Sequence, residues 1–230
     1  MITSSNAAVL IYQEKRTMIH STLKHLLCAC IAGTFILSAP GSSALAGKWR
    51  SLFDGKTLTG WKKTNFGGEG DIEISKGELT LGFGNSMTGI TYDKDDLPKT
   101  NYELRLKAAK LDGNDFFCGI TFPVADSHCS FIVGGWGGGV VGLSSIEDRD
   151  ASENETTTYM NFPHGKWYKV RVRVTPNNIS TWINGKNIVS VNIDGRKIST
   201  RNEVDLNKPL GFSTWETKSA LKDIQIREIK

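Results

Sequence analysis

The 230-residue sequence has few histidines, few cysteines and no excess of charge of one sign. Only two of its four histidines, His128 and His164, lie beyond residue 46, which is too few for a histidine-rich metal site. The first 46 residues hold three of the 28 basic and one of the 24 acidic residues, which leaves 25 against 23, a net charge of +2. Nucleic acids and anionic membranes are therefore poor partner candidates, because affinity for them comes mainly from concentrated Lys and Arg.

The sequence also lacks an apolar run long enough to cross a bilayer. Residues 26–37 are mostly apolar, Lys24 precedes them, and the small residues 42–46 follow. A spanning helix needs about 20 apolar residues. The pattern therefore predicts a signal peptide over residues 1–46 in preference to a membrane anchor. It also predicts export to the periplasm or out of the cell, and a mature form without a membrane span.

The predicted mature chain begins after Ala46. Residues 47–230 suit a single domain with a sizeable core. Met18 is a candidate for the true start of translation, because Glu14 does not suit the positively charged beginning of a signal peptide.

Alternating apolar and polar residues recur along the predicted mature chain. The stretches "YELRLKA" (102–108) and "WYKVRVRV" (167–174) have the period of two that is typical of half-buried antiparallel strands. Asn184-Gly185 predicts a tight hairpin, because both of its central residues need positive φ. About a dozen short strands are expected, with no amphipathic helix, and so many strands do not form one open sheet. The predicted fold is all-β, a two-sheet antiparallel jelly-roll sandwich, in which a concave sheet commonly holds the ligand.

Two cysteines remain in the predicted mature chain. Cys118 and Cys129 lie on apparent strands joined by a turn near residues 125–126, which would place them close to opposite each other. Export permits a disulfide between them, and we predict one. The alternative is a pair of buried free thiols, because Cys packs well as a small apolar residue.

Motifs near both ends and in the middle of the chain point to one family. These are "LFDGKTLTGW" (52–61), "WYKVRVRV" (167–174), "WING" (182–185) and "DIQIREI" (223–229). With them the chain resembles, over about residues 49–229, the 3-keto-disaccharide hydrolase domain family, which is related to concanavalin A-like lectins and glucanases. The opening motif itself has a structural interpretation, in which Asp54-Gly55 forms a turn and Trp61 covers an edge of the sandwich.

The resemblance implies cleavage of glycosides whose sugar carries a ketone at C3. That ketone acidifies the hydrogen at C2, a base removes it, the leaving group departs from C1, and water then adds. Such a route needs a general base, a donor to the enolate oxygen and a proton for the leaving oxygen.

The chain departs from the family pattern where polar residues matter. Many members carry "NSGI..R" on one strand and "(Y/F)E.Q" on the next. Here Phe117 stands for the Asn, Pro123 for the Arg, Ile132 for the Glu and Gly134 for the Gln. A shift by two makes Asn114 the Asn, and the Arg and Glu are still missing. The chain is thus a divergent branch, and the activity does not carry over residue by residue.

Candidate site residues therefore come from the branch's own features. Glycines crowd around Trp136, which indicates bulges or close approach of a ligand, and an exposed indole suits the apolar face of a sugar. The alternative places Trp136 in the core. The candidate substrate-binding residues are Trp136, Asp150, Asn154 and Trp215. The candidate catalytic residues are Glu147, Asp148, Glu216 and His128.

Each of these candidates has a simpler interpretation. The loop at 147–154 is otherwise a solvated surface loop, Trp215 a core residue and His128 a surface histidine. No metal site and no cofactor are predicted. Calcium is kept as an alternative for the acidic loop, whose spacing matches no EF-hand.

Two functions of different classes follow. The first is a secreted glycoside hydrolase or lyase acting on 3-keto-glycosides or related sugars. The second is a non-catalytic domain that binds carbohydrate or the cell envelope. A carbohydrate or glycoside is the expected partner in both. Convergence of Glu147, Asp148 or Glu216 in one cleft favours the enzyme, whereas carboxylates that point to bulk solvent favour the binding domain.

Overall fold

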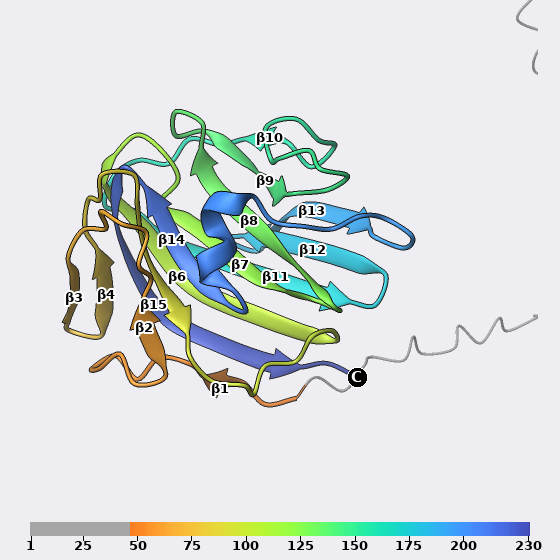
Figure 1. Cartoon of the computed structure of the whole chain (residues 1–230), viewed down its shortest axis with the longest axis horizontal. Coiled ribbons are helices and arrows are strands. Elements are labelled where there is room, and N and C mark those ends of the chain that lie inside the picture. Colours follow the sequence, from red (N-terminus) through yellow and green to blue (C-terminus); the bar gives the residue numbers. More distant parts are fainter. Residues whose placement is uncertain (1–46) are drawn as a thin grey trace, which may run out of the picture. The chain divides into compact units, whose positions relative to one another are not determined.

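Two antiparallel sheets stack face to face in the computed structural model, which describes residues 47–230 (Figure 1). The first sheet has eight strands in the order β13-β12-β11-β6-β15-β4-β3, and β1 pairs with β15 outside this path. Its strands are β1 (Arg50–Ser51), β3 (Ile72–Ser75), β4 (Glu78–Leu81), β6 (Tyr102–Gly113), β11 (Trp167–Thr175), β12 (Asn178–Ile183), β13 (Lys186–Asn192) and β15 (Thr217–Glu228).

The second sheet has seven strands in the order β10-β9-β8-β7-β14-β5-β2. They are β2 (Trp61–Lys63), β5 (Met87–Tyr92), β7 (Cys118–Val124), β8 (Ser127–Gly135), β9 (Val140–Ser144), β10 (Thr158–Tyr159) and β14 (Gly211–Trp215). The one helix of the described residues is the 3₁₀-helix η1 (Asn202–Asn207). The prediction of an all-β two-sheet jelly roll is confirmed.

The alternating stretches form the core as predicted. Leu106 of β6 lies opposite Val170 of β11, and Leu104 lies opposite Val172, all at most 3% exposed. Burial of each such side chain stabilises the fold by about 1.5–3 kcal/mol. Asn184-Gly185 joins β12 to β13 with φ of +51° and +84°, which confirms the predicted hairpin.

The opening motif has the structural role expected of it. Strand β1 pairs with β15, so both ends of the described chain lie in one sheet. The Trp61 Nε1–H donates to the Leu52 carbonyl at 2.6 Å. The Asp54 carboxylate accepts the backbone N–H groups of Thr57 and Lys56, both at 2.8 Å, and these bonds lower the pKa of Asp54 to about 2.

The cysteines do not pair, so the disulfide prediction is wrong. The β7–β8 hairpin turns at residues 125–126, and this register sets Cys118 opposite Val133 and Cys129 opposite Phe122. Both thiols are free and fully buried in the core. Burial raises the pKa of both, that of Cys129 to about 12.

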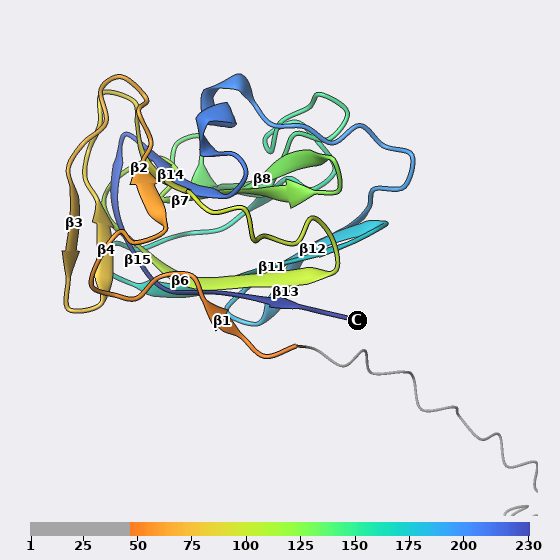
Figure 2. The same cartoon turned by 60° about the horizontal axis from the view of Figure 1, so that its bottom comes forward.

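The helix η1 lies against the outer face of the seven-stranded sheet, the face turned away from the core (Figure 2). Its last residue, Asn207, is fully buried, and its amide donates to Thr64 Oγ1 at 3.0 Å and to the Ile90 carbonyl at 3.3 Å. A Cβ at Gly211 would come within 2.5 Å of the Asn207 Cβ, so glycine lets β14 pass beneath η1. This anchor fixes the wall of the pocket described next.

The signal-peptide prediction and the candidate start at Met18 fall outside the described residues. Within residues 47–230, no helix is both long and apolar enough to span a bilayer.

Candidate functional site

A pocket of about 240 Å³ opens on the outer face of the seven-stranded sheet, beside η1. It is lined by Met87, Asp115, Phe116, Ser130, Ile132, Trp136, Ser144, Arg201, Glu203, Val204 and Trp215. The lining is therefore mainly apolar and aromatic, with three charged side chains and two hydroxyl groups.

The floor of the pocket follows from alternation along β8. Phe131 and Val133 enter the core, so Ser130 and Ile132 point to the other face. Ile132 lies opposite Gly119 on one side and Gly142 on the other, and these glycines add no side chain beside it. Phe116 and Ala151 occupy the space over these glycines and pack against Ile132, which is 5% exposed, so the floor of the pocket is apolar.

Two hydroxyl groups lie at this floor. The Ser130 Oγ is hydrogen-bonded to Thr121 Oγ1 at 2.9 Å. Ser144 is 1% exposed, and its Oγ has no hydrogen-bond partner among residues 47–230. A buried hydroxyl without a partner is costly, so the Ser144 Oγ is a group that a polar ligand or a water would satisfy.

The two candidate stacking residues both line this pocket. Trp136 lies in the glycine-rich turn after β8 with φ of +48°, and it is 42% exposed, so it is not a core residue. Trp215 ends β14 and is partly buried. Their positions, 79 residues apart in the sequence, give no hint of this proximity by themselves.

Charged groups lie at the same pocket. The Asp115 carboxylate accepts the N–H of Phe116 at 2.7 Å and the N–H of Gly137 at 3.1 Å, which ties it to the turn that carries Trp136. Arg201 forms an ion pair with Glu203 at 2.8 Å and another with Asp150. The hydrogen bond from Arg201 lowers the pKa of Glu203, so Glu203 stays ionised.

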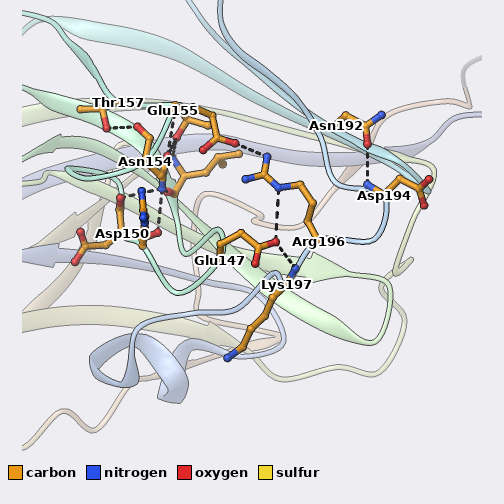
Figure 3. A network of polar contacts seen from close by, with 12 residues as sticks. Glu147, Asp150, Asn154, Glu155, Thr157, Asn192, Asp194, Arg196 and Lys197 are labelled. Atoms are coloured by element: carbon orange, nitrogen blue, oxygen red, sulfur yellow. Dashed lines mark hydrogen bonds and ion pairs between the residues drawn. The ribbon is translucent and has the colours of Figure 1, made fainter.

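The acidic loop candidates lie outside the pocket. The Glu147 carboxylate accepts the backbone N–H of Lys197 at 2.9 Å, and Asp148 pairs with the Lys197 ammonium at 2.7 Å. Figure 3 shows this contact between Glu147 and Lys197, together with the nearby ion pair between Arg196 and Glu155. These exposed carboxylates hold the loop to residues 196–201 and do not converge on a ligand.

The other two catalytic candidates are also absent from the pocket lining. Glu216 is exposed, and its backbone N–H donates to the Ser86 carbonyl at 2.7 Å. His128 lies at the start of β8 and is partly buried. Burial lowers the pKa of His128, and the charge of Lys208 lowers it further. Asp150 reaches the site indirectly, through its ion pair with Arg201.

Asn154 has a structural role in place of the predicted contact with substrate. Its amide donates to the carbonyls of Leu143, Arg149 and Asp150 at 2.8–3.0 Å, and its oxygen accepts from the N–H and hydroxyl of Thr156. The side chain therefore bonds both to the loop and to Leu143 in strand β9 (Figure 3).

We expect Asn154→Ala to lower the free energy of unfolding by about 2–3 kcal/mol, because it leaves several buried carbonyl groups without a donor. The matched change Glu147→Gln, at an exposed ion pair, should cost less than about 1 kcal/mol. Urea unfolding of the two variants measures both values. Equal free energies of unfolding for Asn154→Ala and Glu147→Gln would show that the hydrogen bonds of Asn154 do not stabilise the loop.

The described residues contain no group of three or more His, Cys, Asp or Glu side chains placed to hold a metal ion. Of the acidic loop considered for calcium, Glu147, Asp148 and Asp150 form ion pairs with Arg196, Lys197 and Arg201 respectively.

The comparisons with solved structures agree with the fold. The jelly-roll architecture of two packed sheets occurs in lectin domains among others. The Crh5 transglycosylase in complex with NAG is 14% identical, covers 82% of this chain and 86% of its own, and has a TM-score of 0.55. A Bacillus subtilis protein of unknown function with a galectin-like fold is 10% identical, with coverages of 80% and 96% and a TM-score of 0.53.

The sequence comparison shows the family. The family model of the 3-keto-alpha-glucoside-1,2-lyase-like domain matches residues 48–227. The chain belongs to this family, which confirms the resemblance seen in its motifs. No curated protein matches the chain.

Asp115, Arg201, Glu203 and Ser144 are pocket residues that the sequence analysis missed. Asp115 ends the polar stretch 112–115, just before the apparent strand that holds Cys118, and a polar turn at that place is a signal that could have been used. Arg201 and Glu203 gave no such signal, because η1 is not periodic and its position over the sheet is set by Asn207.

Proposed function

We propose that this protein binds a sugar between Trp136 and Trp215 and cleaves a 3-keto-glycoside there. The observation that supports this most is the pocket itself: in a member of this family, two indole rings share one cavity with Asp115 and Arg201. Aromatic faces suit the apolar face of a sugar ring, and the charged groups suit its polar edge.

The size of the pocket favours a small saccharide. A volume of about 240 Å³ lies below the range of about 300–1,000 Å³ typical of sites for drug-sized ligands. A mono- or disaccharide therefore fits this proposal better than a long polysaccharide chain.

The proposed reaction is an elimination followed by addition of water. Asp115 removes the proton at C2, the electron pair moves into an enolate at the C3 oxygen, and the bond from C1 to the leaving oxygen then breaks. The protonated Asp115 returns its proton to that leaving oxygen, which leaves a double bond between C1 and C2 next to the C3 ketone. Water then adds across this double bond, with its oxygen at C1 and a proton at C2, so the overall hydrolysis balances. Arg201 and the Ser144 hydroxyl stabilise the negative enolate oxygen.

Glu203 has a different role in this scheme. Its lowered pKa keeps it ionised, so it is a poor proton donor, and its ion pair orients Arg201. Export to the periplasm or beyond the cell is also part of the proposal, and it rests on the pattern of residues 1–46.

A non-catalytic carbohydrate-binding domain is the second candidate. It is favoured by Ile132, which lies in the pocket floor at the position where many family members carry Glu. It is also favoured by Glu147 and Asp148, which lie outside the pocket in surface ion pairs.

The test is product release from nitrophenyl 3-keto-glucoside, with the unoxidised glucoside as control. Release from the keto form alone supports the enzyme. Binding of saccharides without product release supports the binding domain. If the protein neither binds saccharides nor releases product, both candidates are contradicted.

We expect Trp136→Ala to weaken saccharide binding about ten-fold or more, because it removes one of the two stacking surfaces. Calorimetric titration or tryptophan fluorescence measures this change. The matched control is Tyr159→Ala, which removes a 73% exposed aromatic ring that does not line the pocket. Unchanged binding in Trp136→Ala would place the sugar elsewhere.

A further inference from the structure

The outer face of the eight-stranded sheet carries basic residues in rows. On β11 the residues Lys169, Arg171 and Arg173 alternate with core valines, so all three side chains point outward. We call the outward side chains of β6, β11, β12 and β15 the basic face; it lies on the opposite side of the sandwich from η1 (Figure 2).

The first row consists of lysines. Lys107 lies directly opposite Lys169 on one neighbouring strand and opposite Lys222 on the other. Neighbouring strands are about 4.8 Å apart, and like charges directly opposite each other destabilise a sheet. Lys107 and Lys222 have acidic partners in Asp223 and Glu78, whereas no acidic partner is found for Lys169 within residues 47–230.

The second row consists of arginines. Arg171 lies opposite Arg105, about 7 Å along the sheet from the lysine row. Within the described chain, Arg105 has no acidic partner and bonds to Gln225 at 2.8 Å. A groove of about 470 Å³ is lined by residues of both rows and by Trp182.

The third row contains an acidic residue. Glu103, which is fully buried, lies directly opposite Arg173 on β11 and Arg227 on β15, and it also contacts Arg171. This carboxylate offsets part of the charge of these arginines, whereas the exposed Arg105 and Lys169 have no acidic partner within residues 47–230. The sequence shows no basic block, because core residues separate these cations along each strand.

We propose that the basic face binds an anionic polysaccharide. Its uncompensated cations face solvent in a groove, and a carboxylated or sulfated sugar chain supplies anions that relieve the repulsion within the rows. This binding site is separate from the pocket and independent of the function proposed for it.

The aromatic rings on this face distinguish the polysaccharide from single-stranded nucleic acid. Trp49, Trp167 and Trp182 each carry a cation over the ring, with Arg105, Lys222 and Arg171 at 3.8–3.9 Å from the respective ring centroids. Binding of single strands relies on open aromatic faces for base stacking. The covered faces favour a polyanion without bases.

The experiment measures binding of the protein to four immobilised polymers at increasing NaCl concentration. Polygalacturonate carries carboxylates, heparin carries sulfates, dextran is neutral, and single-stranded DNA represents nucleic acid. We expect binding to polygalacturonate or heparin that weakens with salt, and none to dextran. Comparison of the first two tells which anionic group is preferred.

The double variant Lys169→Gln/Arg105→Gln should weaken this binding about ten-fold or more. The matched control Lys56→Gln/Lys94→Gln removes two exposed charges that do not line the groove and should bind as the wild type does. Trp136→Ala should also bind normally, which separates this site from the pocket.

Three outcomes would overturn the proposal. They are absence of binding to both anionic polysaccharides, equal losses in the double variant and its control, or tighter binding to single-stranded DNA than to either polysaccharide.

Discussion

Glu103→Gln is expected to lower the free energy of unfolding by about 3–5 kcal/mol, which is typical of removing one partner from a buried charge network. Glu103 is fully buried and accepts from Arg173 Nε and Arg227 Nε, both at 2.7 Å, and from Arg171 at 3.3 Å. Glutamine has nearly the same shape but no charge. The three guanidinium groups would then repel one another without a counter-ion.

The effect should depend on pH in a defined direction. Burial alone raises the pKa of Glu103, but the hydrogen bonds and charges of Arg227, Arg173 and Arg171 outweigh it, so the pKa in the folded protein is below the ordinary value of 4.5. A carboxylate whose pKa is lower in the folded than in the unfolded protein stabilises the fold. This stabilisation is complete at pH values above the pKa of the unfolded state, and it is lost as the pH falls through the pKa of the folded state. The difference between wild type and Glu103→Gln should therefore be full at pH 7 and shrink below about pH 4.5.

Urea unfolding at pH 7 and at several values below pH 5 measures both effects. The control is Glu78→Gln, which removes the acidic partner of Lys222 in a partly exposed pair and should cost only about 0–1 kcal/mol. If Glu103→Gln lowers the free energy of unfolding no more than this control does, the charge of Glu103 is not needed to stabilise the three arginines in the folded protein.

Alternation explains why the fold could be predicted from the sequence. The patterns at 102–108 and 167–174 mark which side chains enter the core, and the observed pairing of Leu104 with Val172 follows from them. The disulfide prediction failed because it depended on register. With a turn at 125–126, Cys118 pairs with Val133, which lies four residues beyond Cys129 on the opposite strand. The alternation of apolar and polar residues does not reveal this offset.

The site could be predicted only in part, because its residues meet through long-range contacts. The glycines around Trp136 pointed to an exposed indole, and Trp136 and Trp215 do share a pocket. The acidity of residues 147–150 was visible too, but the cations that hold it, Lys197 and Arg201, come about 50 residues later in the chain. The local sequence therefore identified the acidic residues of the loop but not the basic residues that pair with them.

The alignment to the family gives a further reason for the partial success. Ile132, which stands where many members carry Glu, lines the pocket, so the motif lies on the surface that carries this pocket. Pro123, which stands for the Arg, pairs with His128 on the same sheet and does not line the pocket. If this branch retains the chemistry, its charged groups must therefore come from other elements, and Asp115 and Arg201 are the ones available.

Asp115→Asn is accordingly expected to lower kcat/KM for nitrophenyl 3-keto-glucoside by about 10²–10⁴-fold, the usual contribution of a general base. Asparagine keeps the size of the side chain, and its oxygen can still accept the N–H of Phe116 or Gly137. Saccharide affinity should therefore change little, and the loss should appear in kcat. Glu147→Gln, a similar change outside the pocket, should leave the rate as it is.

A second readout separates loss of the base from a general disturbance of the site. In deuterated water, the enzyme should exchange the C2 hydrogen of a 3-keto sugar for deuterium, which NMR follows directly. Asp115→Asn should lose this exchange while it still binds the sugar, because removal of the C2 proton comes before bond cleavage in the proposed route. Exchange at the wild-type rate in Asp115→Asn would exclude Asp115 as the base, and a loss of activity in Glu147→Gln would place the chemistry at the loop.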